Sequence, residues 1–293
     1  MTKSLLETGK HTVTALTRPD SKSKLPDGVK IAKVDYNDKN SLVDALRGQD
    51  ALIITMSVMA PPDQEDKLVE AAAEAGVSWI LPNNWSPDTA NEGLTRDVSI
   101  FQKHVKVEKH IEQLAKSSYI AVTTGFWYEW SLAIPAAYGF DFAKREVTFF
   151  DEGEVKISTS TWPQVGRAVA ALLSLPEKDL EHFENKHAYV SSFTVSQKDM
   201  LDSALRVTGS KLEEWEITKE PATERYSKGV EAMKGGDRMG FAKMMYTRVF
   251  YDDGNGDFEK SRGLANELLG LPKEDLDEAT AAAIKRSKEE TWS

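Results

Sequence analysis

The sequence predicts an α/β protein with a doubly wound parallel sheet, and two observations support this. Over roughly the first 125 residues, short apolar or β-branched runs alternate with helical patterns, as in sheets whose strands are joined by helical crossovers. Further along the chain aromatic residues cluster and the alternation stops, which indicates a smaller, mostly helical lobe. The expected fold is therefore Rossmann-like, with this lobe at its carboxyl-terminal end.

The predicted elements are bounded by turn and capping residues. Strands are expected at residues 12–18, 29–35, 51–57, 77–83 and 118–125, with helices at 39–47, 63–76 and 99–116 between them. Beyond the aromatic cluster we expect a short meander at 145–159, helices at 161–176 and 196–209, and a strand at 186–192 that can rejoin the sheet. The predicted domains are 1–130, for nucleotide binding, and 131–293, the lobe, with 157–192 returning to the first domain.

The opening residues have the pattern of a helix that stops at Gly9 and leads into a strand. In nucleotide-binding α/β folds such a helix follows a strand and a glycine-rich loop. Residue 1 falls inside this helix. We therefore expect the first strand of the sheet and its loop to be missing, through a truncated gene model or an alternative start.

The composition argues against several classes of partner and site. A formal charge of −10 over 293 residues argues against nucleic acid or an anionic membrane as partner. The chain has no cysteine and its five histidines lack ligand spacing, so we predict neither disulfides nor a metal site. No apolar run reaches the roughly 18–20 residues of a membrane span, and a cytoplasmic location is expected.

The turn after the first predicted strand bears on cofactor choice. Arg18 ends that strand, where an acidic residue suits NAD and an arginine accommodates the 2′-phosphate of NADP. Ser21 and Lys24 follow and make the turn basic and rich in hydroxyl groups. The turn is therefore a candidate to bind the 2′-phosphate of NADP. The alternative is a solvated turn with ordinary surface charge.

Two further strand ends are candidates to line the cofactor. Asp35 ends the second predicted strand, where it caps the next helix or touches the adenine. A helix-cap role for the region of Asn37 and Asp38 is the alternative. Thr55, Met56 and Ser57 end the next strand. Their small and apolar side chains fit a cofactor at the sheet edge, and they equally fit a core strand.

Three polar residues follow the strand at 77–83 or end it. Asn83, Asn84 and Trp85 offer hydrogen-bond donors at the carboxyl end of a strand, where open α/β sheets bind ligands. We assign Asn83 to the cofactor, and Asn84 and Trp85 to the substrate. The alternative is a loop held by asparagine side chains and two prolines.

The third predicted helix carries the candidate catalytic residues. Its buried stripe at Val107 and Ile111 extends one turn back to His104, which is expected to face the cofactor cleft. Lys103 and Lys106 flank His104. A cationic group here polarises a carbonyl or donates a proton, although a charged helix face is more often merely solvated.

Several stretches resemble the NmrA-like and isoflavone reductase-like family of atypical short-chain dehydrogenase/reductases, especially its fungal members. They cover nearly the whole chain and are LLETGKHTVTALTRPDS, VKIAKVDYNDKNSLVDALRGQDALIITM, ILPNNWSPDT, VTTGFWYEWSL, STSTWPQVGRAVAALLSLP and SSFTVSQKDMLDSALRVTG. The resemblance implies a domain that binds NADP(H) and a lobe that closes over the substrate. It also implies that Phe126, Trp127 and Tyr128 lie on the substrate side with Asn84.

The sequence departs from the family pattern at two places. The family begins with a strand and GxxGxxG, which this sequence lacks. Alignment on Val107 and Ile111 places the family's reductase lysine at His104. Either His104 acts as the acid, or Lys103 or Lys106 replaces it, or the chemistry is lost.

The resemblance implies three alternative functions. Family reductases act on plant phenolics, which implies an NADP-dependent oxidoreductase of an aromatic or hydrophobic carbonyl or enone, with a small-molecule substrate. NmrA itself senses oxidised dinucleotides, which implies a non-catalytic sensor with a regulatory protein partner. The missing loop implies a truncated form that does not bind cofactor.

Overall fold

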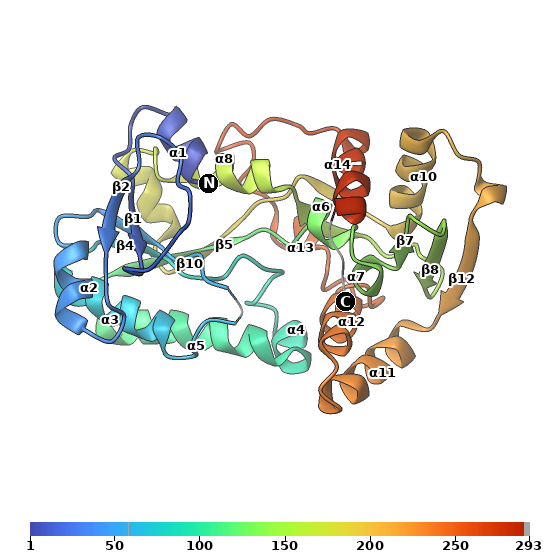
Figure 1. The fold of residues 1–293 in the computed structure, drawn as a ribbon, viewed down its shortest axis with the longest axis horizontal. Helices are drawn as coiled ribbons and strands as arrows, with labels where there is room; N and C mark the ends of the chain where they lie inside the picture. Colours follow the sequence, from blue (N-terminus) through green and yellow to red (C-terminus); the bar gives the residue numbers. More distant parts are fainter. Residues whose placement is uncertain (58, 290–293) are drawn as a thin grey trace. The chain divides into compact units, whose positions relative to one another are not determined.

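The computed structural model describes residues 1–57 and 59–289, and the chain divides into two compact units (Figure 1). Unit 1 contains Met1–Trp85, Ile100–Thr123 and Val165–Ala188. Unit 2 contains Ser86–Ser99, Thr124–Gln164 and Tyr189–Ser293. Each unit is therefore assembled from segments that are not contiguous in the sequence.

Unit 1 contains the predicted parallel sheet. Its strands are β1 Thr14–Thr17, β2 Lys30–Lys33, β3 Ala51–Ile53, β4 Trp79–Leu81, β5 Ser118–Thr123 and β10 Lys186–Tyr189. Four of them lie in the order β10-β5-β4-β3, and β4 runs parallel to both β3 and β5. Among the described residues, β1 and β2 form a separate parallel pair. The prediction that the chain returns to the sheet near residue 186 is confirmed.

The helices of unit 1 bury their apolar sides in one core. They are α1 Thr2–Glu7, α2 Lys39–Leu46, α3 Gln64–Ala75, α5 Ser99–Leu114, α8 Trp162–Leu172 and α9 Glu177–Leu180, followed by the 3-10 turn Glu181–Phe183. Leu42 of α2, Val69 of α3 and Ile111 of α5 share one buried cluster with Ile80 of β4. Spacings of three and four residues put these side chains on single helix faces, as the sequence predicts. This core fixes the strand ends that carry the candidate site.

Unit 2 contains two three-stranded sheets. Its strands are β6 Phe126–Trp127, β7 Phe140–Asp141, β8 Glu146–Phe150, β9 Ile157–Ser160, β11 Phe193–Val195 and β12 Glu216–Glu220. They are ordered β11-β9-β6 and β12-β8-β7. The meander predicted at 145–159 is therefore wrong, because β8 and β9 belong to different sheets. The sequence prediction missed β12, the parallel partner of β8, since its pairing joins segments about 70 residues apart.

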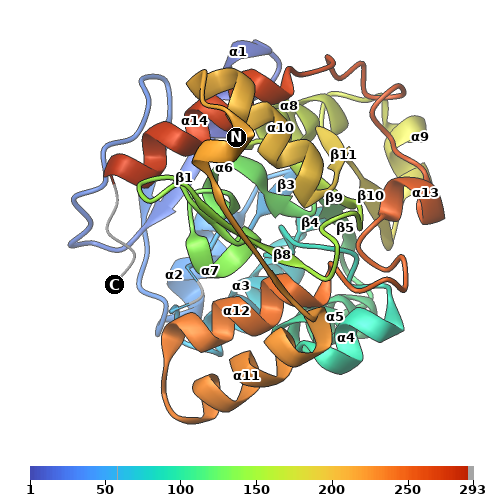
Figure 2. The same ribbon diagram turned by 90° about the vertical axis from the view of Figure 1, so that its right-hand side faces the viewer.

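The helices of unit 2 are α4 Glu92–Asp97, α6 Tyr128–Ser131, α7 Pro135–Tyr138, α10 Gln197–Thr208, α11 Ala222–Lys234, α12 Arg238–Arg248, α13 Phe258–Arg262 and α14 Leu276–Glu289, with a 3-10 turn at Leu212–Glu214. Helices α4, α10, α12 and α13 begin at residues whose side chains cap them. Ser196 caps α10 and Gly209 ends it in the left-handed conformation, both as predicted, and Asp199 completes a capping box with Ser196. Helices α11 and α12 pack side by side (Figure 2).

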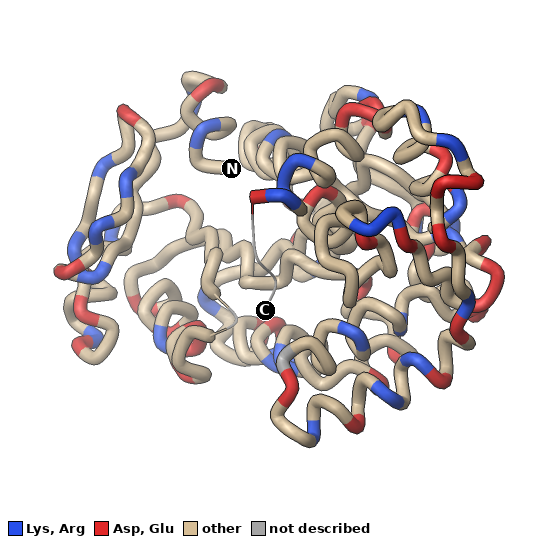
Figure 3. The backbone as a smooth tube through the Cα atoms, turned by 45° about the vertical axis from the view of Figure 1, so that its right-hand side comes forward, with Lys and Arg blue, Asp and Glu red and all other residues tan. Residues whose placement is uncertain are grey.

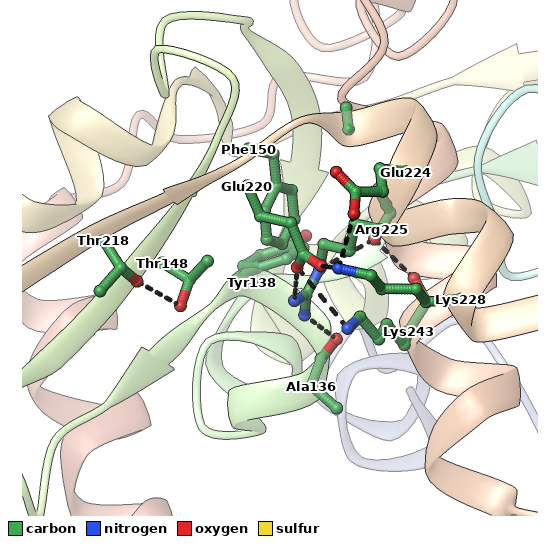
Figure 4. Close-up of polar contacts among 12 residues, drawn as sticks. Ala136, Tyr138, Thr148, Phe150, Thr218, Glu220, Glu224, Arg225, Lys228 and Lys243 are labelled. Carbon is green, nitrogen blue, oxygen red and sulfur yellow. Dashed lines mark hydrogen bonds and ion pairs between the residues drawn. The ribbon is translucent and has the colours of Figure 1, made fainter. Parts of the chain in front are cut away.

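A buried arginine joins several elements of unit 2 (Figure 4). Arg225 of α11 is 6% exposed and donates from Nη1 to Glu220 at 3.0 Å. Its Nε donates to the Thr247 hydroxyl at 3.1 Å, and its Nη2 donates to the Ala136 carbonyl at 2.9 Å. The guanidinium also lies over the Phe150 ring, 4.3 Å from its centroid. One side chain thus ties β12, α12, α7 and β8 together.

The surface charge is mixed. Figure 3 shows acidic and basic residues interspersed along the backbone, without one long basic stretch over the part of the chain that is described. Among residues 1–57 and 59–289, no helix has both the length and the apolar character needed to cross a membrane.

Candidate functional site

The turn after β1 presents an exposed arginine. The Arg18 side chain is 71% exposed and lies 4.0 Å from Asp20. Ser21 donates its backbone N–H to the Arg18 carbonyl at 3.0 Å, which closes the turn, and Lys24 is exposed beyond it. Burial raises the pKa of Tyr36, against a hydrogen bond with Gln64 and the nearby charge of Arg18. Arg18 therefore lies near the carboxyl ends of both β1 and β2.

The next strand end is held by short-range hydrogen bonds. Asp35 accepts the backbone N–H of Asn37 at 2.8 Å, and Asp38 caps α2 by accepting the N–H of Asn40 at 3.0 Å. The predicted capping role of this region is therefore present. The Asp35 side chain remains exposed and close to the end of β2.

The loop after β3 is clamped by an asparagine. Asn83 accepts the Met56 backbone N–H at 3.0 Å and donates to the Met56 carbonyl at 3.1 Å. Thr55 and Ser57 are exposed on either side, while Met56 is half-buried. The Asn83 amide thus holds the loop, and Thr55 and Ser57 are the side chains left facing outward at the end of β3.

Asn84 and Trp85 also make internal contacts. Asn84 is 1% exposed and donates from Nδ2 to Glu108 at 2.8 Å. Trp85 donates from Nε1 to the Ile54 carbonyl at 2.8 Å. Both side chains thereby fix the backbone after β3 and β4, and the asparagine-held loop that the sequence offered as an alternative is present.

His104 is the candidate catalytic residue that the fold buries most deeply. His104 lies on α5 with 8% of the residue exposed, and its ring centroid lies 6.5 Å from that of Phe101. Its Nδ1 is buried and has no hydrogen-bond partner in the described chain. Burial, and secondarily the charge of Lys103, lowers the pKa of His104 to about 4. At neutral pH the ring is therefore uncharged.

The two flanking lysines differ in their environment. Lys103 lies 3.5 Å from the Glu65 carboxylate, which is 2% exposed and also accepts the Asn83 backbone N–H at 2.8 Å. Lys106 is exposed on the outer side of α5. Lys103 therefore balances a buried carboxylate, whereas Lys106 faces solvent.

A buried polar chain in unit 1 was not predicted from the sequence. Glu108, one turn after His104, accepts from Asn84 and lies 3.5 Å from His187 Nε2. His187 Nδ1 is 2.8 Å from the Thr123 hydroxyl at the end of β5. The signal for Glu108 was its position four residues after His104 on the apolar stripe, whereas no local signal pointed to His187.

The aromatic residues of unit 2 divide into core and half-buried groups. Tyr128 is fully buried and its hydroxyl lies 2.8 Å from that of Thr280. Phe126 is 8% exposed and packs against Tyr246, with ring centroids 4.2 Å apart. Trp127 is half-buried, so it is the residue of the three with most surface to offer a ligand.

Trp127 belongs to a cluster that the sequence prediction did not identify. Its ring meets that of Trp162 edge-on, with centroids 5.8 Å apart, and Trp130 lies 5.7 Å from Trp162 on another side. Arg286 stacks over Trp162 at 4.3 Å and over Trp130 at 5.1 Å. The buried Glu129 accepts the backbone N–H of Trp162 at 2.8 Å. We call Trp127, Glu129, Trp130, Trp162 and Arg286 the tryptophan cluster.

Comparison with known proteins gives the family. The model of the NmrA-like family matches residues 1–262. The chain belongs to the NmrA-like family. The oxidoreductase aprR of Aspergillus flavus is 30% identical over 280 residues, covering 94% of this chain and 91% of the relative. The oxidoreductase poxI of Penicillium oxalicum is 25% identical over 290 residues, covering 96% and 88%.

Solved structures share the fold of this NmrA-like chain. AtPrR2 with NADP+ and (+)pinoresinol superposes with a TM-score of 0.78 at 18% identity, covering 96% of this chain and 93% of that one. An isoflavone reductase has a TM-score of 0.73 at 17% identity, covering 95% and 93%. At these identities the likeness shows the fold alone, and it confirms the predicted Rossmann-like α/β class.

Proposed function

We propose that this chain is an NADP(H)-dependent oxidoreductase that reduces an aromatic or hydrophobic carbonyl or enone. The observation that carries the proposal is His104, a buried imidazole with an unpaired Nδ1 at the position where the family resemblance places the reductase lysine. Membership of a family with oxidoreductase relatives supports it, as does the complex of the similarly folded AtPrR2 with NADP+ and pinoresinol.

The residues at the strand ends of unit 1 fit one end of NADPH. The exposed Arg18 guanidinium suits the 2′-phosphate, with Ser21 and Lys24 in the same turn. We assign Asp35, Thr55, Met56 and Ser57 to the remaining cofactor surface, together with the Asn83 amide that shapes it. When bound, NADPH supplies the hydride. Trp127, Phe126 and Trp85 are assigned to the substrate. Tyr128 and Asn84 are buried and hydrogen-bonded within the chain, so we assign them a supporting role beside the substrate and not a direct contact with it.

The low pKa of His104 defines its chemical role. An uncharged imidazole donates one hydrogen bond to the substrate oxygen and stabilises the negative charge that develops there as hydride adds to carbon. At neutral pH the protonated fraction of His104 is too small for this residue to serve as the main acid. The proton that completes the reduction comes from solvent or from Lys103 or Lys106, which lie on the same helix as His104.

Turnover with a panel of enones tests the proposal. NADPH consumption should be steady, and His104→Leu should lower kcat/KM by about 100-fold, the effect of losing one hydrogen-bond donor to a developing oxyanion. His110→Leu is the matched control, since His110 lies on the same helix 3.6 Å from Asp66 and is partly exposed. A variant as active as the wild type would exclude His104 as the donor.

A non-catalytic dinucleotide sensor is the second candidate, and it is favoured by the histidine at the lysine position. It predicts saturable NADP(H) binding, measured by fluorescence titration, with no turnover of any enone. A chain that binds no NADPH at all would instead favour the third function, a form that lacks part of the pocket. Titration of a version extended by a strand and a glycine-rich loop separates that outcome from loss of the site itself.

A further inference from the structure

Three cations of unit 2 share one carboxylate (Figure 4). Glu220 lies 3.0 Å from Arg225, 3.0 Å from Lys228 and 3.6 Å from Lys243. Glu224 adds a second negative charge and pairs with Lys228 at 2.9 Å. Three positive charges therefore face two negative ones, in a chain whose formal net charge is −10.

A glycine explains how two lysines from different helices reach the same carboxylate. Gly229 follows Lys228 directly on α11, and Met244 follows Lys243 directly on α12. A Cβ added at Gly229 would lie 2.6 Å from the backbone nitrogen of Met244, so only glycine allows the two helices to approach this closely. The close approach holds both ammonium groups to Glu220, despite the repulsion between them.

Lys243 is the cation with the weakest pairing. Arg225 has an acceptor for each of its three nitrogens, and Lys228 meets two carboxylates. Lys243 pairs only with Glu220 in the described chain, and at the longest of the three distances. Its side chain is 27% exposed, against 51% for Lys228. Lys243 is thus partly desolvated and close to like charges, and it is still accessible to a small reagent.

The two lysines beside Glu220 differ in how readily they lose a proton. Burial lowers the pKa of Lys243, and the charges of Arg225 and Lys228 lower it further, against the attraction of Glu220. Hydrogen bonds to Glu224 and Glu220 instead raise the pKa of Lys228. At a given pH the uncharged, nucleophilic amine is therefore more abundant at Lys243. Exposure alone would make Lys228 the faster amine, so charge and exposure predict opposite orders.

We propose that Lys243 is a modification site that accepts an acyl group from an acyl phosphate. The lone pair of Nζ attacks the carbonyl carbon and forms a C–N bond, and the bond from that carbon to the phosphate oxygen breaks. Phosphate leaves with the electron pair, Nζ releases a proton to solvent, and nothing is oxidised or reduced. This inference does not depend on the oxidoreductase function proposed above.

The charge of the cluster favours this class of donor. The excess positive charge attracts the anionic phosphate, and the Lys228 ammonium stabilises the negative charge that develops on the carbonyl oxygen. The amide that forms at Lys243 is uncharged. Arg225 and Lys228 then balance Glu220 and Glu224, so the product removes the local excess of positive charge.

Acetylation of the full chain by acetyl phosphate at pH 8 tests the site. Peptide mass spectrometry gives the initial rate at each lysine. The rate at Lys243 should exceed that at Lys228 by about tenfold or more, because reactivity follows the uncharged fraction of each amine. Lys243→Arg keeps the charge and should remove the fast site while leaving the rates at the other lysines unchanged.

A neighbouring substitution tests the cause. Lys228→Met removes a like charge beside Lys243 and a competitor for Glu220, so acetylation at Lys243 should slow by about two- to fivefold. If access limited the reaction instead, removal of the Lys228 ammonium would leave the rate unchanged or raise it. Lys234→Met is the matched control, since Lys234 is an exposed lysine in the last turn of the same helix.

A second donor tests the class of reagent. S-acetyl-N-acetylcysteamine transfers the same acetyl group but carries no charge. Between about 0.01 and 1 M salt the Debye length falls from about 30 to 3 Å, so the rate at Lys243 should fall more steeply with acetyl phosphate than with the thioester. The thioester reaction corrects for any effect of salt on the amine itself.

Three results would overturn the proposal. Equal or faster acetylation of Lys228 would show that Lys243 is an ordinary lysine. An unchanged or raised rate at Lys243 in Lys228→Met would remove the charge argument. The same salt dependence for both donors would exclude recognition of the phosphate. The reaction needs neither NADPH nor an enone, so these results are independent of whether the chain is an oxidoreductase.

Discussion

Two carboxylates of unit 2, the partly buried Glu220 and the buried Glu129, have opposite surroundings. Glu220 meets Arg225, Lys228 and Lys243 at 3.0, 3.0 and 3.6 Å. Burial alone would raise the pKa of Glu220, but the hydrogen bonds from Lys228 and Arg225 and the charge of Lys243 outweigh it and lower that pKa. Glu129 accepts the Trp162 N–H with one oxygen, its other oxygen has no hydrogen bond within the described part of the chain, and burial raises its pKa.

The difference separates a group that stabilises the fold from a group that is available for binding. The network around Glu220 assigns each nitrogen of Arg225 an acceptor, so it is complete without a ligand. Glu129 and, in unit 1, His104 each keep one buried polar atom unpaired. We therefore expect substitutions in the network of Glu220 and Arg225 to affect stability. Substitutions of Glu129 or His104 should affect binding and pH dependence.

Arg225→Met should produce the largest effect on stability. It leaves Glu220 partly buried with only its lysine partners and removes bonds to Thr247 and Ala136, so the free energy of unfolding should fall by about 3–5 kcal/mol. Urea unfolding measures this. Lys228→Met is the matched control, because it removes an exposed partner of the same carboxylate and should cost under about 1 kcal/mol. Equal losses in the two variants would contradict the distinction.

His104→Gln should change the pH dependence of stability. The folded pKa is about 4, against an ordinary value near 6.5, so below pH 6.5 only the unfolded state takes up the proton. Stability should therefore fall as the pH is lowered from 6.5 towards 4. Between pH 7 and 4.5 the wild type should lose about 2–3 kcal/mol more than the variant.

Urea unfolding of both proteins at the two pH values measures that difference. Glu65 and Glu129 have raised pKa values and contribute with the opposite sign, but they are present in both proteins and cancel. If the two proteins respond identically to pH, the imidazole is not held uncharged by the fold.

Arg18→Ala extends the comparison to an exposed charge. The Arg18 side chain is 71% exposed, so its removal should change the free energy of unfolding by under about 0.5 kcal/mol. NADPH binding should nevertheless weaken by about tenfold or more, while NADH binding stays the same, since NADPH alone carries the 2′-phosphate. Fluorescence titration of both cofactors checks this, with the exposed Lys33→Ala as control. Equal weakening of both cofactors would remove Arg18 from the phosphate site.

Local sequence signals predicted the parts of the fold that depend on local chemistry. Ser196 with Asp199, and Gly76 and Gly209, mark helix ends where the structure has them. His104 was placed on the buried stripe of its helix by spacing alone, and it is buried there. Strand β3 is shorter than predicted, because the run after Ile53 is held as a loop by Asn83.

Contacts between segments that are far apart in the chain could not be predicted from the sequence. His187 meets Glu108 across 79 positions of the numbering, and β12 meets β8 across 70, so neither pairing leaves a local pattern. Glu129 was overlooked because a carboxylate among aromatic residues gives no periodic signal, and only burial shows that one of its oxygens is unpaired. The candidate role of His104 was predicted from the sequence, whereas the unpaired Nδ1 of His104 and the unpaired oxygen of Glu129 became visible only with the three-dimensional structure.

The discontinuous make-up of unit 1 has a consequence for synthesis on the ribosome. Its last segment ends at Ala188, so β5 must wait for β10 until that part of the chain has emerged. β5 ends at Thr123 and β10 begins at Lys186, so at ~5–20 residues per second the edge of β5 waits on the order of several seconds for its partner. During that interval the edge of β5 is open to pairing with other chains. Expression yield should therefore respond to translation speed and to chaperones that shield nascent strands.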